Sequence, residues 1–194
     1  MPEYSPIISN ILQLVRLDQR EIELITSRLV STKLRKKEFL LREGEVCKYK
    51  NYVVKGCIVM YYIDEEGRER VVQLADRDHW ANDLYSYFTG NPGNFFLQAL
   101  EDAEVLQLSG PDLDEIFAAV PKMERFFRIR YQNSLVVQQH RIIQNQFETA
   151  EQKYLDFREK YPDLEQRIPL KYIASYLGIT QQFLSVLRAN FARP

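Results

Sequence analysis

The sequence is poor in the residues that most often hold metals or form disulfides. Its 194 residues include only two cysteines, Cys47 and Cys57, and two histidines, His79 and His140. Metal centres are built from several such ligands that converge on one cavity, so no bound metal is expected. Three catalytic signatures are also missing, namely a Gly-x-Ser-x-Gly elbow, a phosphate-binding loop and a His-Glu-x-x-His helix. These absences argue against an enzyme.

Long apolar runs are missing as well, although 45% of the residues are hydrophobic. No run approaches the ~18 apolar residues of a membrane span, so a membrane is not an expected partner. The first residues, Met-Pro-Glu-Tyr-Ser-Pro, do not have the basic segment and apolar segment of a secretory signal. We therefore expect a cytoplasmic protein in which both cysteines are free thiols.

The C-terminal part of the chain has the pattern of two helices joined by a tight turn. The first helix has an apolar face made of Ile173, Ala174 and Leu177. Gly178 ends that helix because it adopts a positive φ without steric cost, and Thr180 can cap the next helix. The second helix has an apolar face made of Phe183, Leu184 and Leu187. This pattern is typical of a DNA-binding helix-turn-helix.

The distribution of charge supports DNA binding. The chain has a formal net charge of −1, yet its segment 166–194 contains four basic residues and no acidic residue. A local positive field is what contact with phosphates requires, whereas a helical hairpin with solvated charges is the alternative. We predict double-stranded DNA as a partner, with contacts from Lys171, Thr180, Gln181, Gln182, Ser185 and Arg188. Lys171 and Arg188 are expected to contact phosphates.

The middle of the chain alternates short β-type runs with glycines. The segment Tyr52–Ile63 is rich in β-branched and aromatic residues, and further runs follow at Arg70–Leu74, Phe95–Leu100 and Glu104–Leu108. Many short strands at close spacing predict an antiparallel jelly roll. Helices are expected on both sides of it, at Ser9–Leu17, Asp18–Leu29 and Pro111–Ala119. The fold class is therefore α+β, with a β-roll domain over residues 1–120.

A long helix is predicted from Pro121 to about Gln146. Apolar and polar residues recur along it at spacings of three and four, as in a coiled-coil seam: Phe126, Ile129, Asn133, Val136, His140, Ile143 and Phe147. Polar residues on a seam fix its register, so we predict a parallel homodimer. The alternative is that the stripe packs on the β domain. The capping box Thr149–Gln152 indicates a hinge, which gives a dimerisation helix at 121–148 and a helix-turn-helix domain at 149–194.

This order of parts resembles the Crp/Fnr family of bacterial transcription regulators, over essentially the whole chain. The most specific matches are Ile173–Thr180, Leu97–Leu106 and Thr149–Tyr154, which are similar to members from the Bacteroidetes. The resemblance implies a homodimer in which a small-molecule effector in the β roll reorients the helix-turn-helix across the hinge. RNA polymerase is an implied partner of any activator. A sensing module with weak or no DNA binding is the alternative.

The resemblance also implies an effector cassette, and the sequence departs from it. Family members that bind cyclic nucleotides use a Gly-Glu pair and, further along, an Arg-Ser pair that holds the phosphate. Asn82 and Asp83 stand at the first pair, and Gly93 and Asn94 stand at the second. Without the arginine we do not expect the usual binding of cyclic AMP, and another ligand, including an apolar one, stays open. The cassette implied by the match comprises Asn82, Asp83, Leu84, Gly93, Asn94, Phe95, Gln138 and Gln139.

The predicted recognition helix departs from the family as well. Members that read G·C-containing sites carry an Arg-Glu pair and a later arginine where this chain has Gln181, Gln182 and Val186. Because glutamine pairs with adenine through two hydrogen bonds, a site that is rich in A·T is expected.

Overall fold

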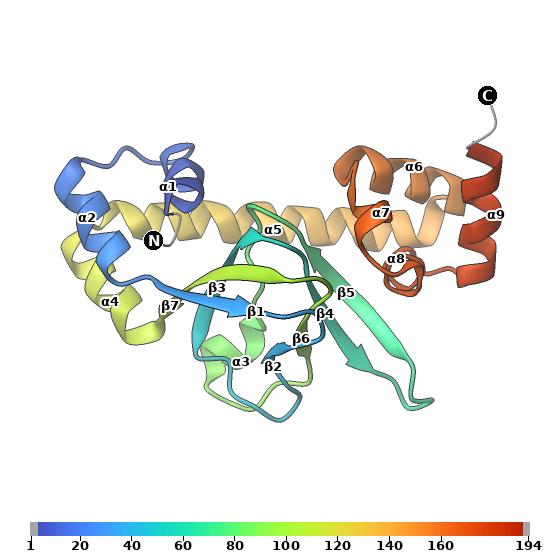
Figure 1. Ribbon diagram of the computed structural model, residues 1–194. Coiled ribbons are helices and arrows are strands. Elements are labelled where there is room, and N and C mark those ends of the chain that lie inside the picture. Colours follow the sequence, from blue (N-terminus) through green and yellow to red (C-terminus); the bar gives the residue numbers. More distant parts are fainter. Residues whose placement is uncertain (1–3, 192–194) are drawn as a thin grey trace.

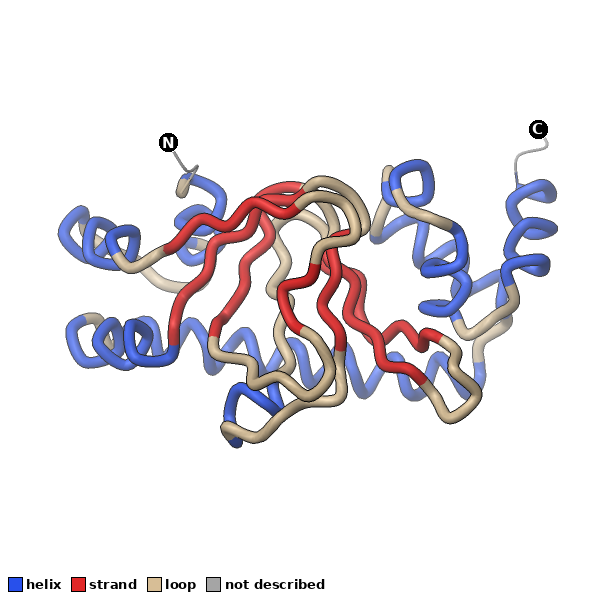
Figure 2. Tube along the Cα trace, turned by 60° about the horizontal axis from the view of Figure 1, so that its bottom comes forward, coloured by secondary structure: helices blue, strands red, loops and turns tan. Residues whose placement is uncertain are grey.

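The computed structural model describes residues 4–191 and is organised along one long helix, α5 (Figure 1). Helices gather at both ends of α5, and the strands lie between the two groups (Figure 2). The helices are α1 (Ser5–Leu12), α2 (Gln19–Ser27), α3 (Leu84–Thr89), α4 (Gly110–Ala119), α5 (Lys122–Phe147), α6 (Ala150–Lys160), α7 (Leu164–Arg167), α8 (Leu170–Leu177) and α9 (Gln181–Phe191). Within this described part, no helix is long and apolar enough to cross a membrane.

The strands form two antiparallel sheets, which confirms the predicted β roll. They are β1 (Val30–Leu34), β2 (Phe39–Leu41), β3 (Tyr49–Lys55), β4 (Ile58–Ile63), β5 (Glu69–Ala75), β6 (Phe96–Ala99) and β7 (Ala103–Ser109). One sheet has the strand order β1-β7-β3 and the other has the order β2-β6-β4-β5. Strand β5 is therefore an edge strand.

Helices cover much of the outer face of each sheet. The inner faces pack on each other through residues such as Val53, Ile58 and Leu97. The outer face of the β3-containing sheet packs on α1, α2, α4 and the start of α5, and the outer face of the other sheet packs on α6 to α9. Successive strand residues point to opposite faces, so two-sided burial explains the continuous apolar run of β3 and β4.

The segment Tyr52–Ile63, which was predicted as one β-type run, is divided into two strands at Gly56. Gly56 has a φ of +84°, and an added Cβ would lie 2.7 Å from the carbonyl oxygen of Asp102. Only glycine adopts this conformation and allows this close approach without cost. The sequence pattern did not predict β1, β2 or the short helix α7, and it placed the first helix several residues too late.

The long helix α5 ends close to the predicted position. Glu148 has an extended backbone, and Thr149 and Gln152 form the expected capping box of α6. The predicted seam is wrong at Phe126, which is 0% exposed and packs in the core beside Trp80. At this end of α5 the apolar face packs on the β roll. The prediction failed here because the spacing of an apolar stripe does not specify which surface the stripe packs against.

The C-terminal helices are docked on the β roll. One continuous apolar core joins Val59, Tyr61 and Leu74 of the sheet to Tyr161 and Ile173 of the helices. Gly178 ends α8 with a φ of +72°, and the hydroxyl of Thr180 accepts a hydrogen bond from the Phe183 amide at 3.2 Å. The two-helix pattern and its cap are thus confirmed.

Polar side chains of the C-terminal half bond to the open edge of β5. The Val71 amide donates to Ser175 Oγ at 2.9 Å, and that hydroxyl donates to the Glu69 carbonyl at 3.0 Å. Arg141 Nη1 donates to the Val72 carbonyl at 2.5 Å, and the Tyr161 hydroxyl donates to the Leu74 carbonyl at 3.1 Å. These bonds occupy backbone groups that an edge strand otherwise leaves unpaired.

Alanine substitutions at Gly56 and Gly67 should separate the energetic cost of steric overlap from that of backbone strain. We expect Gly56→Ala to lower the free energy of unfolding by about 3 kcal/mol or more, because strain and overlap add. Gly67→Ala is the control, since Gly67 has a φ of +75° and nothing within 4 Å of an added Cβ. That control should cost only about 1 kcal/mol. Urea unfolding measures both, and equal losses would contradict the overlap argument.

Candidate functional site

The predicted effector cassette is built around the buried carboxylate of Asp83. Asp83 is 1% exposed and caps α3, since its Oδ1 accepts a hydrogen bond from the Ser86 amide at 3.0 Å. Its other oxygen, Oδ2, is buried and has no hydrogen-bond partner among the described residues. The cassette therefore contains an acidic oxygen that is removed from water and left unpaired, which is costly for a carboxylate.

Gly93 is packed directly against this carboxylate. A Cβ added at Gly93 would overlap the Asp83 carboxylate and would lie 3.1 Å from the Cβ of Ser86. The family's arginine therefore cannot be restored here by adding a side chain, because Asp83 occupies its space. Contact with Asp83 is thus the physical reason why this position holds glycine in place of arginine.

The other cassette residues do not converge on one cavity. Asn82 is used internally, since its Oδ1 accepts a hydrogen bond from the Asn51 amide at 2.7 Å. Leu84 is half-buried, Asn94 is exposed, and Phe95 packs edge-on against Tyr62. Gln138 and Gln139 are exposed on α5. Asp83 and Gly93 of the predicted set lie in direct contact, and the role of Asn82 toward a ligand stays a prediction.

A buried cation lies near the cassette, and the sequence pattern did not identify it. Lys50 of β3 is 1% exposed, and its Nζ has no hydrogen-bond partner among the described residues. It lies over three aromatic rings, at 3.6 Å from the centroid of Tyr87, 4.4 Å from Phe88 and 5.2 Å from Tyr131. The ring faces attract the ammonium and replace part of its hydration.

The cage around Lys50 connects the cassette to the long helix. Tyr87 and Phe88 belong to α3, whereas Tyr131 belongs to α5 and meets Phe88 edge-on at 5.5 Å. Burial lowers the pKa of Lys50 to about 8. Burial also raises the pKa of Cys47, whose amide donates to Ser86 Oγ at 2.8 Å. The sequence around Lys50 gives no sign of this cage. The three aromatic residues that form the cage come much later in the chain.

The predicted recognition helix α9 presents a polar face. Gln181, Gln182 and Ser185 are exposed, while Leu184 and Leu187 are buried against α8 and the rest of the domain. Thr180 serves as the cap of α9. The three polar side chains lie at the start of α9, the part of a recognition helix that reaches base edges in a major groove.

The basic residues that were expected to contact phosphates are paired with carboxylates. Lys171 Nζ lies 2.6 Å from Glu69 of the β roll, and Arg188 Nε lies 2.7 Å from Glu165. Arg167 bridges Asp76 at 2.8 Å and Glu101 at 2.5 Å, both on the β roll. Arg193 lies outside the described residues. Lys171 and Arg188 are thus not free for DNA in this arrangement, contrary to the simple expectation.

The second half of α5 carries an exposed apolar stripe. Val136, Ile143 and Phe147 are 63%, 55% and 78% exposed. Asn133 and His140 are exposed beside them, and Ile129 is half-buried. A stripe of this kind on a folded chain marks a surface for interaction. Six of the seven predicted seam residues therefore remain accessible in part or in full.

Residues that could hold a metal are not grouped in the described part of the chain. No cluster of three or more His, Cys, Asp or Glu side chains occurs there. Cys47 and Cys57 are both free thiols and buried, and burial raises the pKa of Cys57.

Comparisons with known proteins agree with this geometry. A family model described as the cyclic nucleotide-binding domain matches residues 31–119. The chain is similar to the fumarate and nitrate reduction regulatory protein of Vibrio cholerae, with 24% identity over 173 residues that cover 82% of this chain and 68% of that protein. The matched family segment contains the cassette residues from Asn82 to Phe95 but none of α5 to α9, so Gln138 and Gln139 lie outside it.

Solved structures extend the likeness to the C-terminal helices. FixK2 from Bradyrhizobium japonicum aligns with a TM-score of 0.73 at 17% identity, covering 84% of this chain and 83% of that one. The catabolite activator protein of Thermus thermophilus aligns with a TM-score of 0.60 at 17% identity, covering 94% and 86%. At this level of identity the likeness establishes the arrangement of β roll, long helix and C-terminal helices.

Replacement of Lys50 should change stability in a pH-dependent way. Because the folded pKa is about 8 against an ordinary value of 10.5, the unfolded chain binds the extra proton between these values. The Lys50 contribution is therefore least favourable at low pH and improves as pH rises through this window. We expect Lys50→Met to stabilise the fold by about 1–3 kcal/mol at pH 7 and by less at pH 10.

The control is Lys48→Met, because Lys48 is exposed two residues away on the same segment. It should leave stability nearly unchanged at both pH values, and urea unfolding measures the difference between variants. Destabilisation by Lys50→Met at pH 7 would show instead that attraction to the aromatic rings exceeds the cost of burial.

Proposed function

We propose that the chain is a transcription regulator of the Crp/Fnr type, a cytoplasmic homodimer that binds double-stranded DNA through α8 and α9. Its parts are a β roll at 1–120, a dimerisation helix and hinge at 121–148 and a DNA-binding domain at 149–194. A small-molecule effector would act on it without the phosphate contact typical of cyclic AMP, since Gly93 and Asp83 leave no space for an arginine.

One observation carries the DNA-binding proposal. The polar face of α9, with Gln181, Gln182 and Ser185, is exposed on a helix that is correctly capped and rigidly packed on α8. Glutamine side chains at these places can pair with adenine, so the preferred site would be rich in A·T. RNA polymerase would be a further partner if the regulator activates transcription.

The docked arrangement is proposed to oppose DNA binding electrostatically. Glu69 holds Lys171, and Asp76 and Glu101 hold Arg167, so the β roll supplies carboxylates where DNA would supply phosphates. DNA must compete with these carboxylates for the same cations. Release of the domain from the β roll would therefore raise the affinity for DNA, as expected for a shift between two populated states.

Neutralisation of Glu69 should raise affinity for DNA. We expect Glu69→Gln to tighten binding severalfold, because the ion pair with Lys171 stabilises only the docked arrangement. The matched control is Glu66→Gln, since Glu66 pairs with Arg68 in the same hairpin and not with α8. Fluorescence anisotropy with duplexes selected from a random pool, at several salt concentrations, measures the effect.

Lys171→Gln tests the phosphate contact in the same assay. Made in the Glu69→Gln background, where no ion pair is lost, it should weaken binding to all sequences and reduce the slope of log affinity against log salt by about 1. If the native chain and Glu69→Gln both bind no duplex at low salt, the DNA-binding proposal fails. The alternative is a sensing module without DNA recognition. The ion pairs that Lys171 and Arg167 form with the β roll would then favour this alternative.

Dimerisation is proposed to use the exposed stripe of α5. Val136, Ile143 and Phe147 lie on one helix surface beside His140, and pairing with a second copy would remove them from water. Phe126 takes no part, because it is buried in the β-roll core.

A charge on this stripe should abolish the dimer. We expect Ile143→Glu to be monomeric at micromolar concentration, because like charges would meet across the seam. Leu155→Glu on α6 is the control, since Leu155 is 45% exposed but lies off the stripe. Multi-angle light scattering measures the molar mass. A native chain that is monomeric, or an Ile143→Glu variant that stays dimeric, would refute the proposed seam.

A further inference from the structure

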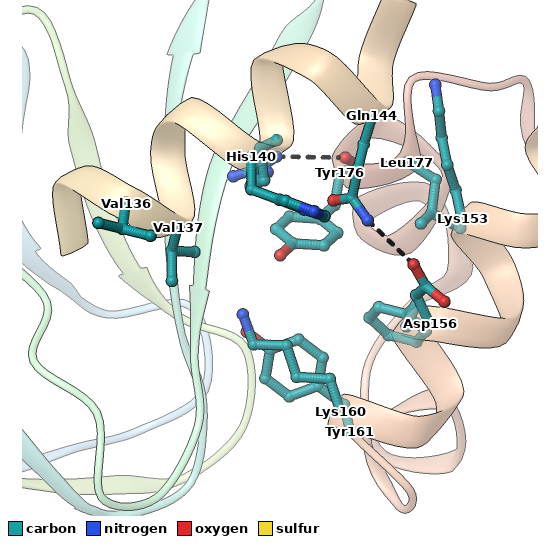
Figure 3. Close-up of a pocket in the computed structure, with 12 residues that line it drawn as sticks. Val136, Val137, His140, Gln144, Lys153, Asp156, Lys160, Tyr161, Tyr176 and Leu177 are labelled. Carbon is teal, nitrogen blue, oxygen red and sulfur yellow. Dashed lines mark hydrogen bonds between the residues drawn. The ribbon is translucent and has the colours of Figure 1, made fainter. Parts of the chain in front are cut away.

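A cavity lies at the hinge, between α5, α6 and α8. Its volume is about 320 Å³, which is at the lower end of the range for small-molecule sites. Figure 3 shows the side chains of these three helices arranged around its open centre. None of its lining residues belongs to the effector cassette, so it is a different place from the expected effector site.

One wall of the cavity is aromatic. Phe157 and Tyr161 of α6 have ring centroids 5.3 Å apart, and Tyr176 of α8 lies 6.0 Å from Phe157 and 6.3 Å from Tyr161. Val137 and Leu177 complete the apolar lining. Such a wall can hold a flat ring by offset or edge-to-face packing.

The charged groups around the cavity are mostly cations. Arg141, Lys153 and Lys160 line it, against a single carboxylate from Asp156. Asp156 Oδ2 already accepts a hydrogen bond from Gln144 Nε2 at 2.9 Å, and Arg141 is engaged by the carbonyls of Val72 and Tyr176. Lys160 lies 5.1 Å from the centroid of Tyr161.

Two of these cations have no acidic partner. Within residues 4–191, neither Lys153 nor Lys160 forms an ion pair. An ammonium group beside an aromatic wall favours an anion that is attached to a flat ring. The ring packs on the aromatic wall, and the anion accepts a charge-assisted hydrogen bond from the ammonium group.

We propose that this hinge cavity binds a small planar aromatic anion, such as an aromatic carboxylate. The ring lies against Tyr161 and Tyr176, and the carboxylate lies beside the ammonium group of Lys160, which borders the open centre (Figure 3). Because α5 precedes the hinge at Glu148 and both α6 and α8 follow it, a ligand in the cavity contacts both sides of the hinge. It therefore stabilises the docked arrangement over any arrangement in which the two sides separate.

Naphthoate is a suitable probe, and its uncharged amide, naphthamide, is the matched ligand control. Titration calorimetry on the full chain, without DNA, should detect binding of naphthoate and at least tenfold weaker binding of naphthamide. We expect Lys160→Gln to lower the affinity for naphthoate about tenfold, as loss of one charge-assisted contact does. Lys153→Gln should bind naphthoate nearly as the native chain does, because the Lys153 side chain points away from the open centre (Figure 3). Lys48→Gln, on the exposed segment before β3, should bind as the native chain does.

Several outcomes would overturn the site. No binding of naphthoate, equal binding of naphthamide, or unchanged binding by Lys160→Gln would each reject it. Val137→Trp is a further variant, because a large side chain at this half-exposed position fills the cavity without entering the core. It should abolish binding while keeping the thermal midpoint, and full binding by this variant would place naphthoate elsewhere.

The effect on DNA rests on the proposed function, whereas the binding test does not. Saturating naphthoate should weaken binding of the selected duplex, and this weakening should be lost in Lys160→Gln. If naphthoate binds but DNA affinity does not change, the claim that the ligand stabilises the docked arrangement is rejected. If no duplex binds at all, the proposed function fails and the calorimetric result still decides the cavity.

Discussion

The docking of α8 on strand β5 is the interaction on which the rest of the structure depends. It joins the sheet and the C-terminal helices in one apolar core, from Tyr61 and Leu74 to Ile173. Around that core, Lys171 and Arg167 are bound by carboxylates of the β roll. The same contacts thus fix the position of α8 and α9 and pair the basic residues of this region with carboxylates. Position and charge are therefore coupled, because the helices cannot leave the sheet without breaking these ion pairs.

The predicted effector cassette is held by internal contacts. Asp83 caps α3 and presses on Gly93, while Asn82 is held by Asn51. Lys50 supplies a buried cation, but its ammonium lies over Tyr87 and Tyr131 and so ties α3 to α5. Buried polar groups without hydrogen-bond partners are costly, and both Asp83 Oδ2 and Lys50 Nζ carry that cost in this part of the β roll.

The sequence was sufficient where the signal is local. The capping boxes at Asp18 and Thr149, the turn at Gly178 and the β-branched runs all predict elements that the structure contains, because each depends on neighbours within a few residues. It failed where the partner is distant along the chain. The spacing of Phe126 fits a seam equally well, and nothing near Lys171 in the sequence points to Glu69. The contact of Gly93 with Asp83 likewise arises only from the folded loop.

The bonds from Ser175, Arg141 and Tyr161 to β5 have a consequence for solubility. When the C-terminal helices leave the sheet, the backbone groups of Glu69, Val71, Val72 and Leu74 lose these partners together. The bare edge of an antiparallel sheet is a template for pairing with another strand, and here it borders an apolar surface. A chain that stays undocked without a partner is thereby exposed to self-association into aggregates. The closed arrangement protects against misassembly as well as holding the helices in place.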